Sequence, residues 1–240
     1  MIDFPDPRQA PQDEDLIAIS QFTLDGQLLT MNPDIEWPKQ TRFGSTWDSE
    51  VLLEAYRRGL FPMPWEIEGI NSAIGWWSPS ERAVFVPAKT QASASTVRAA
   101  KAFRVSVDQA FDSVVRACGD PRRDHGWIDH NVEQAYCALH ALGYAHSIEV
   151  WQSDVLVGGL YGVSLGGVFA GESMFHTVTN ASKVAFHHLV TVLDDGQDRI
   201  IDAQWMSEHL RSLGAETMIR STYCDSLEQL LSVPQARFGM

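Results

Sequence analysis

The sequence predicts a mixed α+β fold, and three features of its second half indicate this class. Residues 146–152 and 155–164 are rich in β-branched and aromatic side chains, and a Ser-Asp pair alone separates them, which is typical of a β-hairpin. A Leu-Gly-Gly turn then leads into a third strand over 168–173. Patterns of a helix, a strand, a helix and a strand follow, and such an alternation after hairpin strands gives a mixed sheet.

The elements after the hairpin follow from capping residues and periodicity. Asn180 precedes an apolar-periodic run and is expected to cap a helix over 181–195. The segments beyond this helix are expected to form a strand, a helix and a last strand: 199–204, 207–214 and 216–223.

Two helices and a strand are expected before the hairpin. Asp129 is expected to cap the helix that Gly143 ends. FRVSVD alternates along its length like a strand. Its last residue, Asp108, is expected to cap the next helix, which Gly119 closes.

The first part of the chain predicts an arm and a small domain. The Pro- and Asp-rich beginning favours an extended arm with one hairpin, turned at Asp25-Gly26. Residues 46–59 have apolar residues at helical spacing and predict a helix, after which the two prolines of FPMPW are expected to break the chain. The expected organisation is an arm over 1–40, a small α/β domain over 41–100 and a larger domain over 101–240.

Several features favour a cytoplasmic protein. No apolar run approaches the roughly 20 residues of a membrane helix, and the acidic, proline-rich N-terminus lacks a signal-peptide pattern. The three cysteines, Cys118, Cys137 and Cys224, are widely spaced and are expected to be reduced thiols. We therefore expect no contact with a membrane.

The charge is unevenly distributed along the chain. The net charge of -13 argues against nucleic acid, yet residues 51–123 hold ten of the 18 Lys and Arg and only seven of the 31 Asp and Glu. A local basic face could hold a phosphate backbone despite the acidic total. Scattered surface charge is the alternative that charge alone favours.

Common catalytic signatures are absent from the sequence. His187 and His188 are neighbours on an expected helix, so they point in different directions and do not form a metal site by themselves. We find no G-x-S-x-G elbow, no Walker loop and no G-x-G-x-x-G after a strand. The sequence therefore predicts neither a metal nor a nucleotide cofactor.

Two adjacent tryptophans form the first notable cluster. In a strand, Trp76 and Trp77 face opposite sides, so one can pack inward while the other lines a surface pocket. An exposed aromatic face can stack on a nucleobase. A role in the core remains the more common alternative.

Polar residues in two apolar strands form the second and third clusters. Glu172 lies among apolar residues, and a buried carboxylate must meet a cation, hydrogen-bond donors or a ligand such as an ammonium group. Its partner could instead be Lys183 or an Arg. Asp202 and Gln204 are two residues apart on a strand and face one side. Glu172, Asp202 and Gln204 could thus form one pocket that positions an amine and accepts its proton.

Six motifs occur in one order over roughly residues 50–219: WWSP, GGLYG, GESMF, NASK, ID-x-Q and SLGA. Together they resemble the bacterial leucyl/phenylalanyl-tRNA–protein transferases, most specifically over 126–183. The resemblance implies a larger domain similar to the GNAT acetyltransferases. It also implies transfer of Leu or Phe from aminoacyl-tRNA to the α-amine of an N-terminal Arg or Lys, which marks the protein for degradation, without metal or acetyl-CoA.

The resemblance also implies roles for individual residues. Glu172 would hold the amino group of the aminoacyl moiety, and Asp202 and Gln204 would form the reaction centre, with the identity of the base left open. The side chains expected to surround the aminoacyl group and the terminal adenosine are Trp76, Trp77, Trp127, Leu160, Phe169, Met174 and Ile201. The basic residues expected to contact the tRNA backbone are Arg57, Arg58, Lys101 and Arg104.

The sequence departs from the family pattern at three places. RFGSTWDS replaces a glycine-rich stretch before the first helix, MIRSTY lacks a usual proline, and His176 stands where Ser is more usual. The alternatives are an acyl-CoA N-acetyltransferase, disfavoured by the lack of a Gly-rich pyrophosphate turn, and a non-catalytic binder of tRNA or N-terminal peptides. The preference among Leu, Phe and Met stays open, as does the oligomeric state.

Overall fold

Contacts divide the chain into two compact units. The computed structural model describes residues 4, 6–12, 14–22, 27–31, 41–42, 47–67, 70–123 and 127–239. The first unit comprises Met1–Arg82 and Met218–Glu228, and the second comprises Ala83–Thr217 and Gln229–Met240. The chain passes from one unit to the other within strands β6 (Glu81–Phe85) and β12 (Glu216–Ile219).

This division differs from the expected domain boundaries at residues 40 and 100. Strand β1 (Leu16–Phe22) pairs with β5 (Ile70–Trp77), so its residues belong to the sheet of the first unit and not to a separate arm. Helix α2 (Ala94–Ala100) packs against α5 (Ala181–Leu193) and belongs to the second unit. Sheet pairing and helix packing, which local sequence patterns do not reveal, set the boundary between the units.

The first unit contains a five-stranded sheet in the order β3-β2-β1-β5-β4. Strand β1 pairs with β2 (Gln27–Met31) in an antiparallel register that brings Phe22 opposite Leu28, as the predicted hairpin requires. The expected Asp25-Gly26 turn lies outside the described residues. The remaining elements of this unit are η1 (Pro7–Gln9), β3 (Thr41–Arg42), α1 (Ser49–Arg57), β4 (Phe61–Ile67) and part of α7 (Arg220–Ser232).

The prediction that FPMPW breaks the chain is wrong, because these residues lie in strand β4. Pro62 and Pro64 are paired with Trp76 and Ile74 of β5. Strand β4 is at the edge of the sheet, where a residue without a backbone N–H is tolerated. The predicted helix before it is confirmed, since α1 begins after Asp48, whose carboxylate accepts the backbone N–H of Glu50 at 2.9 Å.

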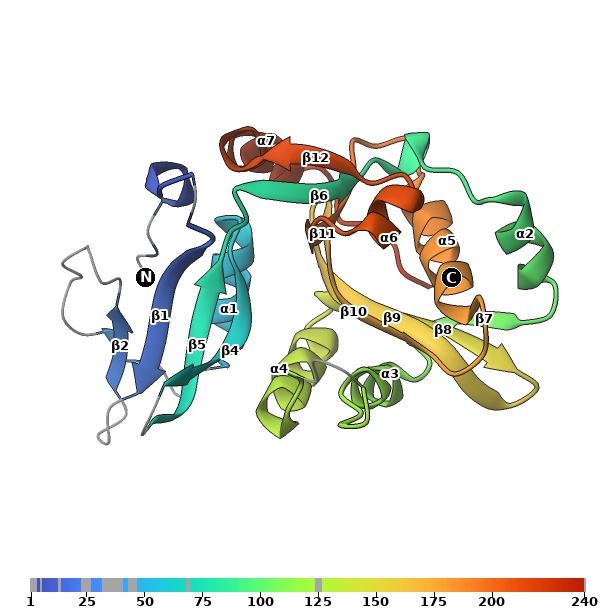
Figure 1. The fold of residues 1–240 in the computed structure, drawn as a ribbon, viewed down its shortest axis with the longest axis horizontal. Coiled ribbons are helices and arrows are strands. Elements are labelled where there is room, and N and C mark those ends of the chain that lie inside the picture. The colour runs from blue at the N-terminus through green and yellow to red at the C-terminus, as the bar shows by residue number, and fades with distance from the viewer. Residues whose placement is uncertain are drawn as a thin grey trace. The chain divides into compact units, whose positions relative to one another are not determined.

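The second unit is built on a seven-stranded sheet in the order β12-β6-β11-β10-β9-β8-β7 (Figure 1). Strands β8, β9 and β10 are antiparallel neighbours, whereas β10 and β11 are parallel, so the predicted mixed α+β class is confirmed. The strands not yet bounded are β7 (Arg104–Val107), β8 (Ala145–Gln152), β9 (Val155–Leu165), β10 (Val168–His176) and β11 (Ile200–Trp205).

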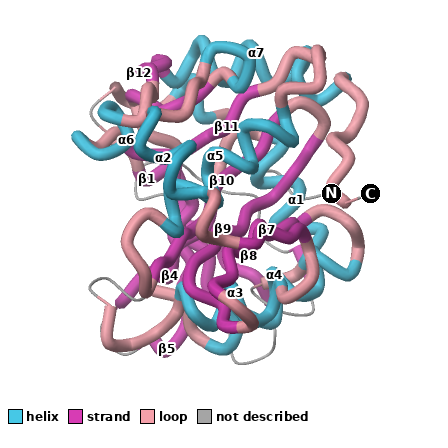
Figure 2. The backbone as a smooth tube through the Cα atoms, turned by 90° about the vertical axis from the view of Figure 1, so that its right-hand side faces the viewer, coloured by secondary structure: helices cyan, strands magenta, loops and turns pink. Residues whose placement is uncertain are grey.

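Helices cover both faces of this sheet. Helices α3 (Phe111–Cys118) and α4 (His130–Ala141) contact one face, and α5 contacts the other, as Figure 1 shows. Figure 2 shows α2 lying beside α5. The remaining elements are η2 (Pro87–Lys89) and α6 (Glu208–Ser212).

The main hydrophobic core of the second unit lies between the sheet and α5. It includes Phe169 and Ile201 from adjacent strands and Leu189 from the helix, each almost completely buried. The rings of Phe85 and Phe186 pack with their centroids 4.6 Å apart. This core fixes β10 and β11 against α5, and these two strands carry the polar residues singled out by the sequence.

The hairpin and two caps follow the sequence prediction closely. Ser153 takes a left-handed conformation in the β8–β9 turn, with φ of 52°, and Gly166 does the same between β9 and β10, with φ of 56°. The carboxylate of Asp129 accepts the backbone N–H of Val132 at 2.9 Å and caps α4. At the other end of this helix, Gly143 has φ of 80°, which ends the helix as expected.

Three local predictions are wrong. Asp108 does not cap α3, because its carboxylate accepts from Ser147 N and pairs with His146 Nδ1 at 2.7 Å on β8. Asn180 precedes α5 but makes no side-chain cap hydrogen bond. The expected strand over 216–223 ends at Ile219, and helix α7 follows, because Arg220 is drawn into buried backbone contacts.

Candidate functional site

The site begins at an irregularity in strand β10. Gly171 pairs with Gly162 of β9, but the next pair joins Ser173 to Tyr161, so Glu172 is an extra residue in β10. Such a β-bulge bends the strand and redirects the side chain at the bulge, and bulges are frequent next to active sites. The side chain at this irregular position is the carboxylate of Glu172.

Glu172 is buried, with 8% of its surface exposed, and meets hydrogen-bond donors from two elements. Tyr136 of α4 donates its hydroxyl to Oε2 at 2.8 Å. The side-chain amide of Gln204 lies 3.4 Å from Oε1, which is long for an N–H···O hydrogen bond. The contact with Gln204 is therefore weak, whereas Tyr136 holds the other carboxylate oxygen firmly.

Asp202 and Gln204 are brought to Glu172 by the pairing of β10 and β11. In the parallel register Ala170 lies opposite Asp202, which is 2% exposed. Oδ1 of Asp202 accepts the backbone N–H of Gln204 at 2.9 Å. This bond fixes the backbone that presents the Gln204 amide to Glu172.

The backbone at Gln204 is strained. Its φ of 65° lies in the left-handed region, which a residue with a Cβ atom adopts at a cost of about 1–2 kcal/mol. Strained residues of this kind cluster at functional sites, where the surrounding structure maintains them. The regular alternation assumed from the sequence fails at Gln204, but its side chain still reaches Glu172.

The three polar residues can position an amine. A buried carboxylate can hold an ammonium group, an amide can both donate and accept, and a second buried carboxylate fixes the amide backbone. The alternative partner Lys183 makes no hydrogen bond or ion pair with a described residue, so it is not joined to Glu172. The arrangement fits chemistry in which a bound amine is oriented and loses a proton.

Two buried groups beside Glu172 were not singled out by the sequence. Tyr161 is fully buried, its ring meets that of Tyr136 edge-on at 5.3 Å, and its hydroxyl has no hydrogen-bond partner among the described residues. Burial, together with the nearby Glu172 carboxylate, raises the pKa of Tyr161 well above its usual value. Burial likewise raises the pKa of the Cys118 thiol to about 11, so this thiol is neutral at ordinary pH.

Arg123 joins α3 to strand β10 and was not predicted as a site residue. Its guanidinium donates to the carbonyl of Cys118 at 2.8 Å and to the carbonyl of Met174 at 2.7 Å. Met174 is two residues after the bulge, so Arg123 helps to fix the strand that carries Glu172. The only signal in the sequence was its membership of the basic segment 51–123.

Four of the predicted apolar site residues gather in one cluster. Leu160 pairs with Met174 across β9 and β10, and Phe169 pairs with Ile201 across β10 and β11. Leu160, Phe169 and Ile201 are buried in the core against α5, and Met174 packs against the same core while half-buried. Trp127 is half-buried and belongs to the same unit.

The tryptophan pair belongs to the first unit. Trp76 is fully buried and meets the ring of Phe4 edge-on at a centroid distance of 4.9 Å, so it is a core residue of that unit. Trp77 is half-buried, as the opposite orientation of neighbouring strand residues requires. Of the two, Trp77 therefore has the surface that a stacking ligand needs.

The predicted basic contacts differ in their surroundings. Arg57 is exposed, whereas Arg58 donates to the Glu54 carboxylate at 2.8 Å and to the carbonyl of Phe4 at 2.9 Å. In the second unit Lys101 is exposed, and the guanidinium of Arg104 lies over the Trp151 ring at 4.8 Å. Arg57, Lys101 and Arg104 are accessible cations, while Arg58 is held by its own unit.

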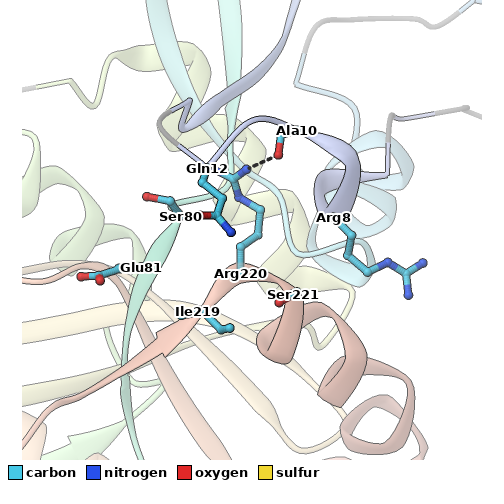
Figure 3. A pocket seen from close by; sticks show the side chains of 8 residues that line it. All are labelled: Arg8, Ala10, Gln12, Ser80, Glu81, Ile219, Arg220 and Ser221. Carbon is cyan, nitrogen blue, oxygen red and sulfur yellow. Dashed lines mark hydrogen bonds between the residues drawn. The ribbon is translucent and has the colours of Figure 1, made fainter.

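A cavity of about 280 Å³ in the first unit lies next to a buried arginine (Figure 3). Arg220 donates to the carbonyls of Ser78, Pro11 and Glu14, and Figure 3 shows its side chain directed toward Ala10. These contacts tie the N-terminal segment to α7. The guanidinium of Arg220 is thus occupied by backbone carbonyls and has a structural role beside the cavity.

The cysteines, the helices and the possible metal ligands were also considered in the sequence predictions. All three cysteines are unpaired. Among the residues that the structure describes, no helix is both long and apolar enough to cross a membrane. Within the same part of the chain, no group of three or more His, Cys, Asp or Glu is arranged to hold a metal ion.

Comparison with known families defines the class of protein as a transferase. The family model described as leucyl/phenylalanyl-tRNA protein transferase matches residues 84–228, and the model of that family's N-terminal domain matches 48–80. The chain belongs to the leucyl/phenylalanyl-tRNA protein transferase family. The predictions of the family and of a transferase are therefore confirmed.

Curated relatives are similar over most of their length. A leucyl/phenylalanyl-tRNA–protein transferase of Desulfatibacillum aliphaticivorans is 46% identical over 81% of this chain and 84% of its own. A protein of the same name from Shewanella denitrificans is 45% identical over 78% and 79% of the two chains. A third, from Pseudomonas fluorescens, is 43% identical over 80% and 84%.

Solved structures show weaker likenesses. A GCN5-related N-acetyltransferase-like protein from Streptococcus suis is 15% identical, with a TM-score of 0.34 over 71% of this chain and 64% of that one. A conserved protein of unknown function from Bacteroides thetaiotaomicron is 10% identical, with a TM-score of 0.40 over 65% and 57% of the two chains.

Proposed function

We propose that this chain, in the cytoplasm, transfers Leu or Phe from aminoacyl-tRNA to the α-amine of proteins that begin with Arg or Lys. The amine nitrogen forms a bond to the aminoacyl carbonyl carbon, and the bond from that carbon to the ribose oxygen breaks. The proton lost by the amine passes to the leaving oxygen. The new N-terminal residue then marks the acceptor protein for degradation.

Each residue of the polar cluster has a separate role in this reaction. Glu172 binds the amino group of the aminoacyl moiety, because a buried carboxylate favours an ammonium group over an uncharged one. The Gln204 amide contacts the attacking amine or the ester, and Asp202 positions Gln204 through its backbone N–H. The ester is already activated, so bringing the two substrates together supplies a large part of the rate enhancement.

The apolar residues are assigned to the donor's side chain. Met174 and Trp127 are half-buried and contribute accessible apolar surface, and Leu160, Phe169 and Ile201 form the wall behind it. Such a wall favours bulky side chains that are unbranched at Cβ. Trp77 offers an aromatic face for a base, and Arg57, Lys101 and Arg104 offer cations for phosphates.

One observation supports this proposal most directly. Within a chain of this family, neighbouring strands bring the Gln204 amide within 3.4 Å of Glu172, and the Asp202 carboxylate fixes the Gln204 backbone. Two acids and an amide converging from β10 and β11 are what amine positioning requires, and a covalent nucleophile is not needed.

The test is a transfer assay with separate donors. Purified protein is mixed with labelled Phe-tRNA and a peptide beginning with Arg, and label is expected on that peptide. A peptide of the same sequence with an acetylated N-terminus serves as the control and should stay unlabelled. Label from acetyl-CoA instead would favour the acetyltransferase alternative, and retention of Phe-tRNA without transfer would favour the non-catalytic binder.

A further inference from the structure

The second unit contains a hollow that shares no lining residue with the candidate site. It measures about 140 Å³ and is lined by the segment from η2 to α2, by α5 and by the end of α6. Figure 2 shows α2 and α5 side by side. Its polar lining residues include Thr90, Ser93, Thr96, Lys183, His187 and Ser212.

The charge of this lining is unusual for the protein. The chain has a net charge of -13, yet the described residues that line the hollow include no Asp or Glu, whereas they include Lys183 and His187. These two residues are one turn apart on α5, so their side chains lie on the same face of the helix. The hollow therefore favours an anion.

Lys183 supplies the charge that a ligand would meet. It is half-buried, and its ammonium group makes no hydrogen bond or ion pair with another described residue. A partly desolvated cation without a partner is unfavourable, so a bound anion at this position would be stabilised.

Hydroxyl groups on the opposite wall are held in place. Thr90 donates its hydroxyl to the carbonyl of Val86 at 2.9 Å. The Ser93 hydroxyl accepts the backbone N–H of Thr96 at 3.1 Å, and the hydroxyls of Ser93 and Thr96 lie 2.9 Å apart. The only proton of the Thr90 hydroxyl is already donated to Val86, so the donors left for phosphate oxygens are the Lys183 ammonium group, the His187 imidazole and one hydroxyl of the Ser93–Thr96 pair.

We propose that this hollow binds a phosphate group of the donor tRNA backbone, with Lys183 as its cation. The inference rests on the proposed function, because the donor is then the polyanion that the protein must hold. The space suits the ligand, since 140 Å³ is several times the roughly 30 Å³ that one water occupies. Helix α2 also carries Arg98, and Lys101 follows at its C-terminal end; both would meet neighbouring phosphates.

The test is equilibrium binding of uncharged tRNA to the full chain at several salt concentrations. Lys183→Gln is expected to weaken binding about 5- to 10-fold at 0.1 M salt. It should also reduce the slope of log K against log salt by about 0.7 to 0.9, the value for one lost phosphate contact. Lys183→Arg should restore most of the affinity, because it restores the charge.

The matched control is Lys89→Gln, which removes the same charge from an exposed residue next to Thr90. An equal loss in both variants, or an unchanged slope in Lys183→Gln, would overturn the assignment. Ser212→Glu, at an exposed position of the hollow, tests the site again if Lys183→Gln does not fold, and it should weaken binding, with unchanged binding counting against the site.

Two further outcomes separate this inference from the proposed function. A wild-type chain that binds no tRNA would contradict both, whereas normal tRNA binding by Lys183→Gln would contradict this inference alone. Inorganic phosphate serves as a second probe in a thermal-unfolding assay. If phosphate raises the melting temperature of the wild type but not of Lys183→Gln, and tRNA binding is unaffected, the site holds free phosphate and the assignment to tRNA is wrong.

Discussion

At the scale of single residues, the second unit contains two buried glutamates with different surroundings. Glu149 is fully buried and accepts hydrogen bonds from the hydroxyls of Ser147, at 2.5 Å, and Ser106. Residues of its own strand β8 and of the neighbouring strand β7 therefore satisfy its carboxylate. Glu172 lies at a bulge, where it accepts the Tyr136 hydroxyl and makes a long contact with the Gln204 amide. A buried carboxylate alone therefore does not mark a site, and the donors around it make the difference.

The strain at Gln204 gives a prediction that separates stability from activity. Glycine adopts a φ of 65° without a steric penalty, so Gln204→Gly should be more stable than Gln204→Ala by about 1 kcal/mol. Both variants should lose most of the transfer activity, because both lack the amide. Urea unfolding measures the first expectation and the transfer assay the second. A Gly variant less stable than the Ala variant would show that the backbone at this position is not strained.

The Cys118 thiol gives a prediction about pH. Its pKa is about 11 in the folded protein and about 9 when exposed, because burial disfavours the thiolate. The stability contributed by the neutral thiol is complete below pH 9 and is lost as the pH rises toward 11. The expected loss is on the order of 3 kcal/mol. Denaturant unfolding at pH 8 to 11 should therefore show a steeper fall for the wild type than for Cys118→Ala, and parallel curves would contradict this account.

At the scale of elements, the sequence predicted those whose signals are local. The hairpin turn at Ser153, the cap Asp129 and the chain reversal at Gly166 are properties of a few adjacent residues. Strand β4 was missed because an edge position tolerates prolines, which is a property of the whole sheet.

The candidate site, like the elements, was predictable only where its signals are local in the sequence. The period of two expected for Asp202 and Gln204 fails because the Gln204 backbone is left-handed, but the parallel pairing of β10 and β11 still brings the Gln204 side chain to Glu172. The bulge and the contribution of Tyr136 could not be predicted, because they depend on pairing with β9 and packing of α4. Helix α7 was missed for a similar reason, since the contacts of Arg220 are with residues distant in the sequence.

The β9–β10 pair next to the bulge gives a prediction with an internal control. A Cβ atom on Gly162 would collide with the carbonyl oxygen of Ala170 and lie 2.5 Å from Cε1 of Phe169. Gly162→Ala should therefore destabilise the protein by about 1–3 kcal/mol. Gly171 lies directly opposite, and its Cβ would meet only the carbonyl oxygen of Asp202 at 3.5 Å. Gly171→Ala should be tolerated in thermal unfolding, and equal losses in both variants would contradict this packing.

At the scale of the whole molecule, a strongly acidic protein has to bind a polyanion. The net charge of -13 would repel tRNA if it were spread evenly, but the segment 51–123 is basic. Exposed cations of this segment occur in both units, with Arg57 in the first and Lys101 and Arg104 in the second. The proposed function assigns donor binding to surface cations and chemistry to a buried cluster, so the two should respond differently to mutation.

The measurement that tests the central claim most directly is single-turnover transfer by Asp202→Ala, with donor affinity measured in parallel. The substrates are labelled Phe-tRNA and a peptide beginning with Arg. We expect transfer to fall by about 10²-fold or more, because a reacting group displaced by about 1 Å can cost that much, while the Kd for Phe-tRNA stays within about twofold of the wild type. Transfer at the wild-type rate, or an equal loss of transfer and of affinity, would contradict a reaction centre built on Asp202, Gln204 and Glu172.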